Sequence, residues 1–415
     1  MTEPTYDVIL NTLVFGGDAL GKLPDGRAVF VPYALPGETV RLRLVEEKPH
    51  HARAELVEVL HTVSQRIKPR CTHFGVCGGC HYQHLVYADQ LAAKSAILRD
   101  QLRRIGGLDD IPLLPSVASP QEWHYRNTVQ FHLTDDGKPG YLSAGTQKIF
   151  PIQECFLPET PLNDLREQLV FDPLLDLKRI SLRMGTDHDL MLILESDNIQ
   201  APQLTVEGLP LSVVHLSPAG KIVMAGSDYI MMEISHKRFH VSAESFFQVN
   251  NGAAQRLVDL ILENLTLSGD ETLLDIYCGV GFFSAFLAQQ VKRLIGIESS
   301  ASACDDFAVN LNAYDNVELY QDAAENVLPQ LDIKIDVAII DPPRAGMAKD
   351  ALQGLLHLAP HNLVYISCDP ATLSRDAHLL MQGGYRLQSI TPIDMFPQTC
   401  HIESISFWAK IEKST

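Results

Sequence analysis

The distribution of apolar and polar residues divides the chain into three parts. In the first part, residues 28–32, 38–45 and 52–60 alternate apolar and polar side chains with period two. Such alternation is typical of strands with one buried face, and glycine- and proline-containing turns separate the segments. We expect a five-stranded β-barrel of the oligonucleotide-binding type over residues 1–62, and a generic small barrel without a ligand fits the same pattern nearly as well.

The second part, residues 63–245, begins with a group of cysteines and continues as a helix. The helix is predicted over residues 87–105, because Gly106 and Gly107 follow as a stop signal, and it could pack on the third part of the chain. Residues 120–245 combine short apolar runs with turn residues, which indicates antiparallel β structure. The pattern therefore predicts a mainly β central domain.

The third part, residues 246–415, alternates apolar strand-like runs with helical segments. This order predicts a parallel, doubly wound α/β sheet. In such sheets ligands bind beyond the carboxyl ends of the strands. Polar or reactive residues that directly follow a predicted strand are therefore the first candidates for a functional site.

A glycine loop follows the first predicted strand of this sheet, residues 272–276. Gly279 and Gly281 let the backbone approach a ligand closely, and Ser284 stands where a dinucleotide-binding fingerprint has a third glycine. Asp275 precedes the loop, where a carboxylate would repel a pyrophosphate but could hold the amino-acid end of S-adenosylmethionine. These features favour a methyltransferase over a dehydrogenase.

Two acids follow the next two predicted strands. Glu298 comes 23 residues after Asp275, a spacing that suits a carboxylate on a ribose diol. Asp322 follows the strand at residues 317–320, from where it could reach an adenine amino group. Their register with the glycine loop strengthens the prediction of an S-adenosylmethionine site.

The fourth and fifth predicted strands lead into groups suited to pyrimidine chemistry. Asp341-Pro-Pro-Arg344 follows one of them, and Cys368 follows the other. Amino-group methyltransferases usually carry an aromatic residue after the two prolines, and Arg344 does not suit that role. Asp341 could instead accept the imide proton of a uracil.

Methylation of uracil at C5 requires prior activation of the ring. A thiolate adds at C6, C5 then attacks the methyl group, and a base removes the C5 proton to release the enzyme. Cys368 fits the nucleophile, and Glu403 is the candidate base, because Ile402 and Ile405 indicate burial that would raise its pKa. His401 is a weaker candidate, because its side chain is expected to face away from that of the next strand residue.

A second group of reactive residues consists of cysteines in the central part. Cys71, Cys77 and Cys80 follow one another with spacings x5 and x2, and Cys155 is a candidate fourth member. Zinc ribbons and iron–sulfur sites both use such thiol pairs. Neither a second Cys-x2-Cys pair nor a spaced histidine pair is present, which favours a structural or RNA-organising iron–sulfur cluster over zinc.

Charge and composition change this picture only slightly. The net charge of −18 argues against bulk attraction of nucleic acid, although residues 61–110 hold seven Lys and Arg against four Asp. No apolar run reaches the ~18 residues of a membrane helix, and the first residues do not resemble a secretion signal. We expect a cytoplasmic monomer without membrane contact.

Together these motifs resemble the family of RNA uridine-5 methyltransferases that carry an N-terminal TRAM barrel and an iron–sulfur cluster. The resemblance spans nearly the whole chain and rests on the cysteine group, Phe-Phe-Gln-Val-Asn at 246–250, the glycine loop, Asp-Pro-Pro-Arg and residues 367–370. It implies S-adenosylmethionine as the methyl donor, Cys368 as the nucleophile and Glu403 as the base. The resemblance further implies two sets of ligand-binding residues: Cys71, Cys77, Cys80 and Cys155 on a [4Fe–4S] cluster, and Gln248, Tyr277, Glu298, Asp322 and Asp341 around the cofactor and uracil.

The same resemblance bears on the RNA substrate. The combination of barrel and cluster is most like the 23S ribosomal RNA enzymes, which predicts methylation of a uridine in that RNA. A transfer RNA uridine is the alternative, and a non-catalytic RNA-binding iron–sulfur protein is an alternative of a different class. Phe246 and Phe247 could stack on a flipped base. Arg126 could contact RNA or form a structural salt bridge.

Overall fold

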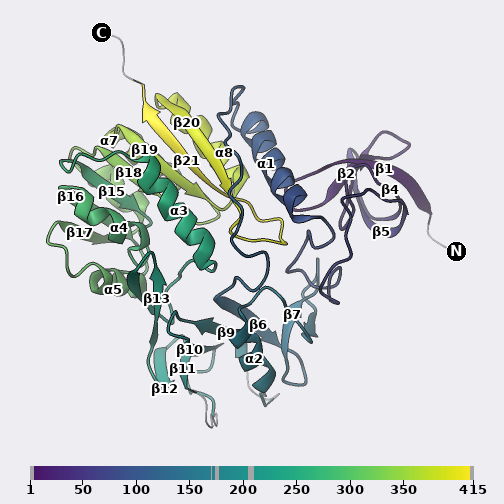
Figure 1. The fold of residues 1–415 in the computed structure, drawn as a ribbon, viewed down its shortest axis with the longest axis horizontal. Coiled ribbons are helices and arrows are strands. Elements are labelled where there is room, and N and C mark those ends of the chain that lie inside the picture. The colour runs from purple at the N-terminus through teal and green to yellow at the C-terminus, as the bar shows by residue number, and fades with distance from the viewer. Residues whose placement is uncertain (1–3, 170, 173–176, 204–209, 412–415) are drawn as a thin grey trace.

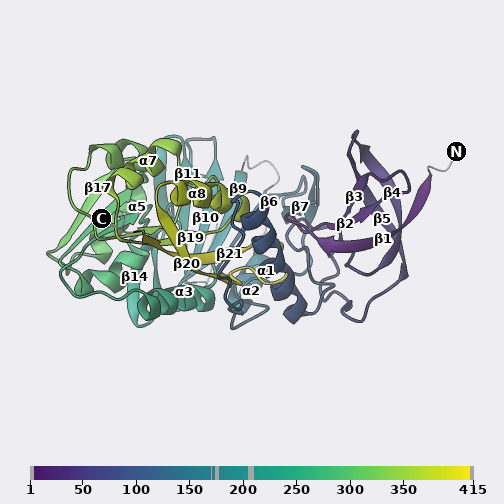
Figure 2. The same cartoon turned by 90° about the horizontal axis from the view of Figure 1, so that it is seen from above.

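The computed structural model describes residues 4–169, 171–172, 177–203 and 210–411. A small barrel, a central sheet and an α/β domain lie next to one another, with one long helix between the barrel and the α/β domain (Figures 1 and 2). Within the described residues, no helix is long and apolar enough to cross a membrane.

The N-terminal strands close into a barrel in the order β1-β2-β3-β5-β4. Its interior is filled by the alternating apolar side chains, among them Val8, Val29, Val40 and Leu42, which are at most 4% exposed. The barrel strands are β1 (Thr5–Leu13), β2 (Ala19–Lys22), β3 (Ala28–Val31), β4 (Thr39–Glu47) and β5 (His51–His61).

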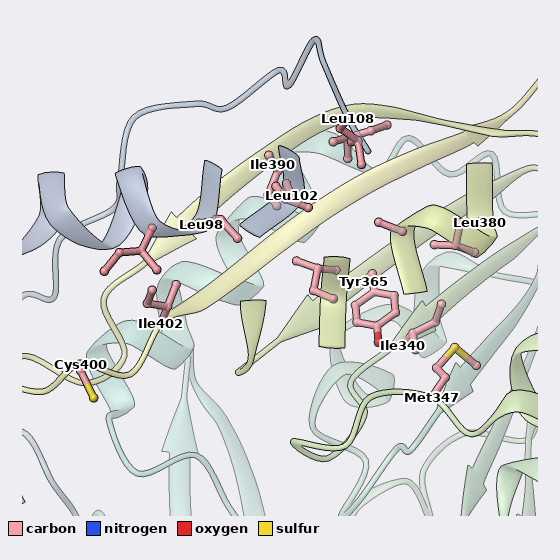
Figure 3. Close-up of a cluster of buried hydrophobic side chains, with 14 of the residues drawn as sticks. Leu98, Leu102, Leu108, Ile340, Met347, Tyr365, Leu380, Ile390, Cys400 and Ile402 are labelled. Carbon is pink, nitrogen blue, oxygen red and sulfur yellow. The ribbon is translucent and has the colours of Figure 1, made fainter. Parts of the chain in front are cut away.

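The long helix α1 (Tyr87–Arg104) ends one residue before its predicted end. It packs its apolar face, including Leu98 and Leu102, against helix α8 (Pro370–Gln382) and against strand β20 (Tyr385–Ile393) near Ile390 (Figure 3). The same cluster of buried side chains continues into the barrel interior. The helix therefore joins the barrel and the α/β domain through one apolar core.

The central sheet has the strand order β12-β11-β10-β9-β6-β7-β8. Its pairs are antiparallel as expected, except that β10 and β11 run parallel, and the short helix α2 was not anticipated. Its elements are β6 (Thr128–Leu133), β7 (Pro139–Leu142), β8 (Ile149–Pro151), α2 (Thr160–Gln168), β9 (Leu177–Met184), β10 (Leu190–Ser196), β11 (Leu211–Ser217) and β12 (Gly220–Ala225).

A two-stranded hairpin, β13 (Tyr229–Ile234) and β14 (Lys237–Ser242), connects the central sheet to the α/β domain. Its buried side chains share one apolar cluster with Ile193 of β10 and with the α/β helices. The predicted domain boundary at residue 245 thus falls where the two parts are packed together, and it stays a prediction.

The α/β domain is built on a seven-stranded sheet in the order β17-β16-β15-β18-β19-β21-β20. The first five of these strands are parallel, which confirms the predicted doubly wound core, and β21 pairs antiparallel with both β19 and β20. Its strands are β15 (Thr272–Ile276), β16 (Arg293–Glu298), β17 (Val317–Gln321), β18 (Val337–Ile340), β19 (Asn362–Ser367), β20 (Tyr385–Ile393) and β21 (Glu403–Lys410). Its helices are α3 (Asn251–Asn264), α4 (Phe282–Leu287), α5 (Ala301–Asn310), α6 (Ala324–Val327), α7 (Lys349–Leu358) and α8 (Pro370–Gln382), with short 3₁₀ turns at Ala288–Gln290 and Leu328–Gln330.

Candidate active site

A cavity of about 1120 Å³ opens at the carboxyl ends of the parallel strands. This position is the one that the doubly wound topology favours for ligand binding. Seven of the residues predicted to act on the cofactor or the uracil line this cavity: Gln248, Tyr277, Glu298, Asp322, Asp341, Cys368 and Glu403.

The glycine loop packs closely against the protein at Gly281, whereas an added Cβ at Gly279 would meet no atom within 4 Å. Gly281 has φ +84°, and a Cβ at this position would lie 2.9 Å from Cδ2 of Phe307. Tyr277, which is not a glycine, also has a positive φ of 66°. The backbone N–H groups of Tyr277 and Cys278 both donate to the carbonyl of Ile297, which holds this conformation.

Glu298 is fixed at the end of β16 by three backbone hydrogen bonds. Its Oε2 accepts from the N–H of Gly279 at 3.0 Å, and its Oε1 accepts from those of Ser299 and Ser300 at 2.8 and 2.7 Å. Asp322 accepts from the N–H of Ala323 at 2.7 Å and from Asn326, and these bonds lower its pKa. Both carboxylates are thus oriented before any ligand enters.

The expectation for Asp275 was wrong. Its side chain is fully buried and does not line the cavity, so it cannot touch the amino-acid end of a cofactor there. It accepts a 2.6 Å hydrogen bond from the hydroxyl of Ser284 on α4. Burial raises the pKa of Asp275 to about 6. The serine at the third-glycine position therefore serves to fix β15 to the first turn of α4.

The thiol and two acids predicted for uracil chemistry meet at the other end of the cavity. Burial, followed by the nearby Glu403 and Asp341, raises the pKa of Cys368 to about 12. The Arg344 guanidinium acts in the opposite direction and favours the thiolate. Arg344, which lines the same cavity, thus favours the reactive form of Cys368.

Both acids favour the protonated form. Glu403 is 6% exposed at the start of β21, and burial, reinforced by Asp341, holds its pKa well above the usual range. Burial raises the pKa of Asp341 to about 7, with a further contribution from Asp275. The burial expected for Glu403 is confirmed. A carboxyl group with a raised pKa can act as a general base or acid near neutral pH.

His401 also has its side chain at the cavity. It lines the same cavity as Glu403, which is two residues further on, and in extended backbone side chains two residues apart share a face. Its ring is 5.6 Å from that of Phe396, which also lines the cavity. Burial and neighbouring cations lower the pKa of His401 to about 3, so the imidazole is neutral. Phe396 was missed because it lies in a loop without a motif.

The two phenylalanines before Gln248 have different surroundings. Phe247 is 7% exposed and packs against Phe239 and Phe282, with ring centroids 5.5 Å apart in each pair. Phe246 is 69% exposed and lines the cavity. Both residues border the cavity, but the exposed ring of Phe246 is the better placed of the two to stack on a base. Phe283, one of the two aromatic residues that follow the glycine loop, is also buried, so aromatic residues stand there because they pack in the apolar core.

The four cysteines of the central part are free thiols in one neighbourhood. The charge of Cys155 contributes to the raised pKa values of Cys71, Cys77 and Cys80, although burial is the largest cause. However, among the described residues no group of three or more His, Cys, Asp and Glu side chains is placed to hold a metal ion. The expected [4Fe–4S] site is thus not formed by these side chains as they stand.

Arg126 does not form the salt bridge that was one of its two predicted roles. None of the ion pairs found in the described parts of the chain includes it. Its Nε is 3.5 Å from the hydroxyl of Tyr125, and its guanidinium lies 6.0 Å from the ring centroid of Phe396. It also affects the pKa of Cys80 and of His401. The side chain therefore lies between the cysteine group and the cavity.

Comparison with known proteins identifies the family. A model of the tRNA (uracil-5-)-methyltransferase family matches residues 193–411, more than half of the chain. The chain belongs to this family. A TRAM domain model also matches residues 4–57, which coincide with the barrel. As a family member, the protein is an RNA methyltransferase, and the alternative of a non-catalytic binding protein is set aside.

Individual relatives extend the match over the whole chain. An uncharacterized RNA methyltransferase of Thermosynechococcus vestitus is 33% identical over 97% of this chain and 97% of its own length. One of Aquifex aeolicus is 32% identical, with 98% and 99% covered. The crystal structure of the Pyrococcus abyssi tRNA (uracil-54, C5)-methyltransferase, in complex with S-adenosyl-L-homocysteine, has a TM-score of 0.74 and covers 97% of this chain and all of its own. At 24% identity, that structure supports the fold alone.

Proposed function

We propose that this methyltransferase transfers a methyl group from S-adenosylmethionine to C5 of a uridine in 23S ribosomal RNA. The observation that carries the proposal is the cavity in which Cys368, Asp341 and Glu403 converge at the ends of neighbouring strands. No single motif brings these three residues together, because they come from three separate segments of the chain. Their combination suits the activation of a pyrimidine ring.

The donor would bind at the glycine-loop end of the cavity. Glu298 and Asp322 are the oriented carboxylates for its ribose and adenine, and Gln248 and Tyr277 line the same end of the cavity. When bound, S-adenosylmethionine supplies the electrophilic methyl group. Asp275 is excluded from direct contact, so other atoms of the loop would hold the amino-acid end of the donor.

The chain's own residues would carry the remaining chemistry. The Cys368 thiolate would form a bond to C6, and the electron pair of the C5–C6 double bond would move to C5. C5 would then take the methyl group, whose bond to the donor sulfur breaks with release of S-adenosylhomocysteine. Glu403, in its carboxylate form, then accepts the C5 proton, and the C5–H electron pair re-forms the double bond while the C6–S bond breaks. Asp341 can accept a hydrogen bond from the N3–H group of the uracil. Arg344 favours the thiolate form of Cys368, both before it attacks C6 and after it is released.

The uridine must leave its base stack to enter the cavity, because C6 is inaccessible within a helix. Phe246, exposed at the cavity, would stack on the extruded base. Transfer RNA is the second candidate substrate, and what favours it is the transfer RNA activity that gives the matched family its name. The choice of 23S RNA rests on the combination of barrel and cysteine group.

We further propose that Cys71, Cys77, Cys80 and Cys155 hold a [4Fe–4S] cluster. Its support is the proximity of the four thiols and the cation of Arg126 beside them. Burial raises the pKa of Cys77 to about 11 and of Cys80 to about 12, so metal binding would have to displace both protons and reorient the side chains. Anaerobically purified protein should contain iron and sulfide in equal amounts, and Cys80→Ser should lose both. Metal-free wild-type protein with full activity would contradict this proposal.

The proposed activity is tested by supplying methyl-labelled donor with unmodified ribosomal and transfer RNAs and identifying the labelled nucleoside by mass spectrometry. We expect 5-methyluridine in 23S RNA, and no label with the Cys368→Ala variant. Label only in transfer RNA would retain the mechanism and replace the substrate. No label in either RNA, with the donor bound, would overturn the proposal.

A further inference from the structure

The loop that joins β20 to β21, residues 394–402, forms one wall of the cavity. It carries Phe396 and His401, which both line the cavity, and it ends at Glu403. Glu403 itself is held in the sheet by its pairing with Ile393 of β20, so the loop bounds the space around its carboxyl group and sets how β21 is entered. Most of the side chains that hold the loop come from outside the α/β domain.

The first of these is Lys94 on α1. Its ammonium group donates to Oδ1 of Asp394 at 2.6 Å and to the carbonyl oxygen of Phe396 at 3.0 Å. Lys94 is 3% exposed and Asp394 2%, so this ion pair is fully buried. Removal of one partner of such a pair leaves an uncompensated buried charge, and the loop would have to move to hydrate it.

The second is Gln90, one helical turn earlier. Its Nε2 donates to the side-chain carbonyl of Gln398 at 3.0 Å, and its Oε1 accepts from the Gln398 N–H at 3.1 Å. Gln398 has φ +69°, a conformation that is unfavourable for a residue with a side chain and persists only when its surroundings hold it. The two hydrogen bonds from Gln90 hold Gln398 in this conformation.

The barrel and the cysteine segment reach the same loop. The carbonyl of Gln398 accepts hydrogen bonds from the N–H groups of His81 and Tyr82, which directly follow Cys80. The barrel turn at Gly17 packs so closely that an added Cβ would lie 3.0 Å from the Cβ of Cys400. Figure 3 shows Cys400 and Ile402 below helix α1, away from its end near Leu102. Three segments of the N-terminal third therefore contact this loop: helix α1, the residues that follow Cys80, and the barrel turn at Gly17.

We propose that Gln90 and Lys94 are positioning residues that align Glu403 for proton removal. The inference rests on the proposed function, since it takes Glu403 as the base. It gives the N-terminal third a role in the reaction that does not depend on contact with RNA. Undocking of α1 would leave Cys368 in place at the end of β19 but would displace the loop that leads to Glu403.

The test compares two steps of the reaction in a Lys94→Met variant. RNA that contains 5-fluorouridine reports on thiol addition and methyl transfer, because the fluorine at C5 cannot be removed as a proton and the covalent complex remains. Turnover on ordinary uridine RNA additionally requires Glu403. We expect turnover to fall about 10- to 100-fold, whereas the rate of complex formation changes less than about twofold.

Arg104→Met is the matched control. Arg104 pairs with Asp100 on the exposed face of the same helix, with Nε 2.9 Å from Oδ2, and this variant should leave both rates unchanged. If Lys94→Met fails to fold, the Lys94→Met/Asp394→Asn double variant removes the buried charge. It should recover thermal stability without recovering turnover, because the bond to the Phe396 carbonyl is still absent.

Equal losses in both rates, or no loss of turnover, would overturn the inference. Recovery of turnover in the double variant would also overturn it, because it would reduce Lys94 to a charge-balancing role. If the wild-type protein forms neither product nor covalent complex with any RNA, the proposed function fails, and this inference fails with it.

Discussion

The arginines of the barrel and those of the cavity differ in their partners. On the barrel surface, Arg41 bonds to Asp7 at 2.9 Å, Arg53 lies 3.1 Å from Asp18, and Arg43 pairs with Glu55. At the cavity, Arg375 pairs with Asp376 at 2.7 Å, whereas Arg344, which also lines the cavity, and Arg126 beside it belong to none of the ion pairs found among the described residues. Arg344 instead faces the Cys368 thiol and the Glu403 carboxyl group.

This difference assigns the two sets of arginines different functions. Cross-strand pairs neutralise the barrel cations and add a little stability to the sheet, but they leave little charge for a phosphate backbone. The uncompensated positive charge lies within and beside the cavity, among buried groups where electrostatic interactions are strong. We infer that charge acts on the reaction mainly at the cavity, and that RNA binding by the barrel would depend on shape and uncharged contacts.

The largest effect is expected for Glu403→Gln, which leaves the cavity cations and the thiol in place but removes the base. Turnover should fall at least about 1000-fold, because Glu403 is the group proposed to accept the C5 proton. Addition and methyl transfer should continue, so a denaturation-resistant complex of protein and RNA should accumulate on a denaturing gel. Loss of turnover without such a complex would show that Glu403 acts before the C6–S bond forms.

Arg344→Met tests the cavity side of the comparison directly. Arg344 lowers the pKa of Cys368, so its removal should raise that pKa and reduce the thiolate fraction at every pH below it. At pH 7.5 we expect a fall of about 10-fold, with the wild-type rate reached only about one pH unit higher. Arg344→Lys retains a positive charge at this position and should therefore keep most of the lowering of the Cys368 pKa. A pH–rate profile that does not shift in Arg344→Met would contradict the assignment.

The raised pKa of Glu403 also predicts how stability depends on pH. Because its folded-state pKa lies above the usual value, the neutral carboxyl contributes stability that is fully present below about pH 4.5 and is lost as pH rises through the folded pKa. Glu403→Gln should therefore raise the melting temperature more at pH 8 than at pH 5, by about 2 °C or more in thermal denaturation. An equal change at both pH values would mean that the carboxylate is not penalised by burial.

The smallest effect is expected on the barrel. Arg41→Met breaks exposed ion pairs with Asp7 and Glu58, which contribute little to stability because water and salt screen them. Methylation rates and their dependence on salt should stay within about twofold of the wild type in steady-state assays. A large loss of RNA affinity, or a flatter salt dependence, would show that the barrel cations bind phosphate despite their acidic partners.

The cavity was predictable because regular structure determines where its residues meet. Glu298, Asp322, Asp341 and Cys368 each follow a strand, and a parallel sheet brings the ends of those strands to one edge. Strand periodicity and the motifs together were therefore sufficient for these residues. Glu403 was found by its position on β21, whose antiparallel pairing with β19 brings it beside Cys368.

Other parts of the site left no signal in the sequence. Lys94 and Asp394 are 300 residues apart, and neither periodicity nor spacing relates a helix residue to a loop so distant. Asp275 precedes the glycine loop, but its carboxyl turns inward to Ser284, an orientation set by side-chain packing. The parallel pairing of β10 with β11 likewise depends on a crossover that apolar alternation does not encode.

The central claim is that Cys368 attacks a uridine in this cavity, and covalent capture tests it most directly. The holoprotein would be incubated with donor and 5-fluorouridine-containing 23S RNA, digested, and mapped by mass spectrometry. We predict a nucleotide adduct on Cys368 that carries the transferred methyl group. An adduct on another cysteine, or none while ordinary RNA is still methylated, would contradict the account.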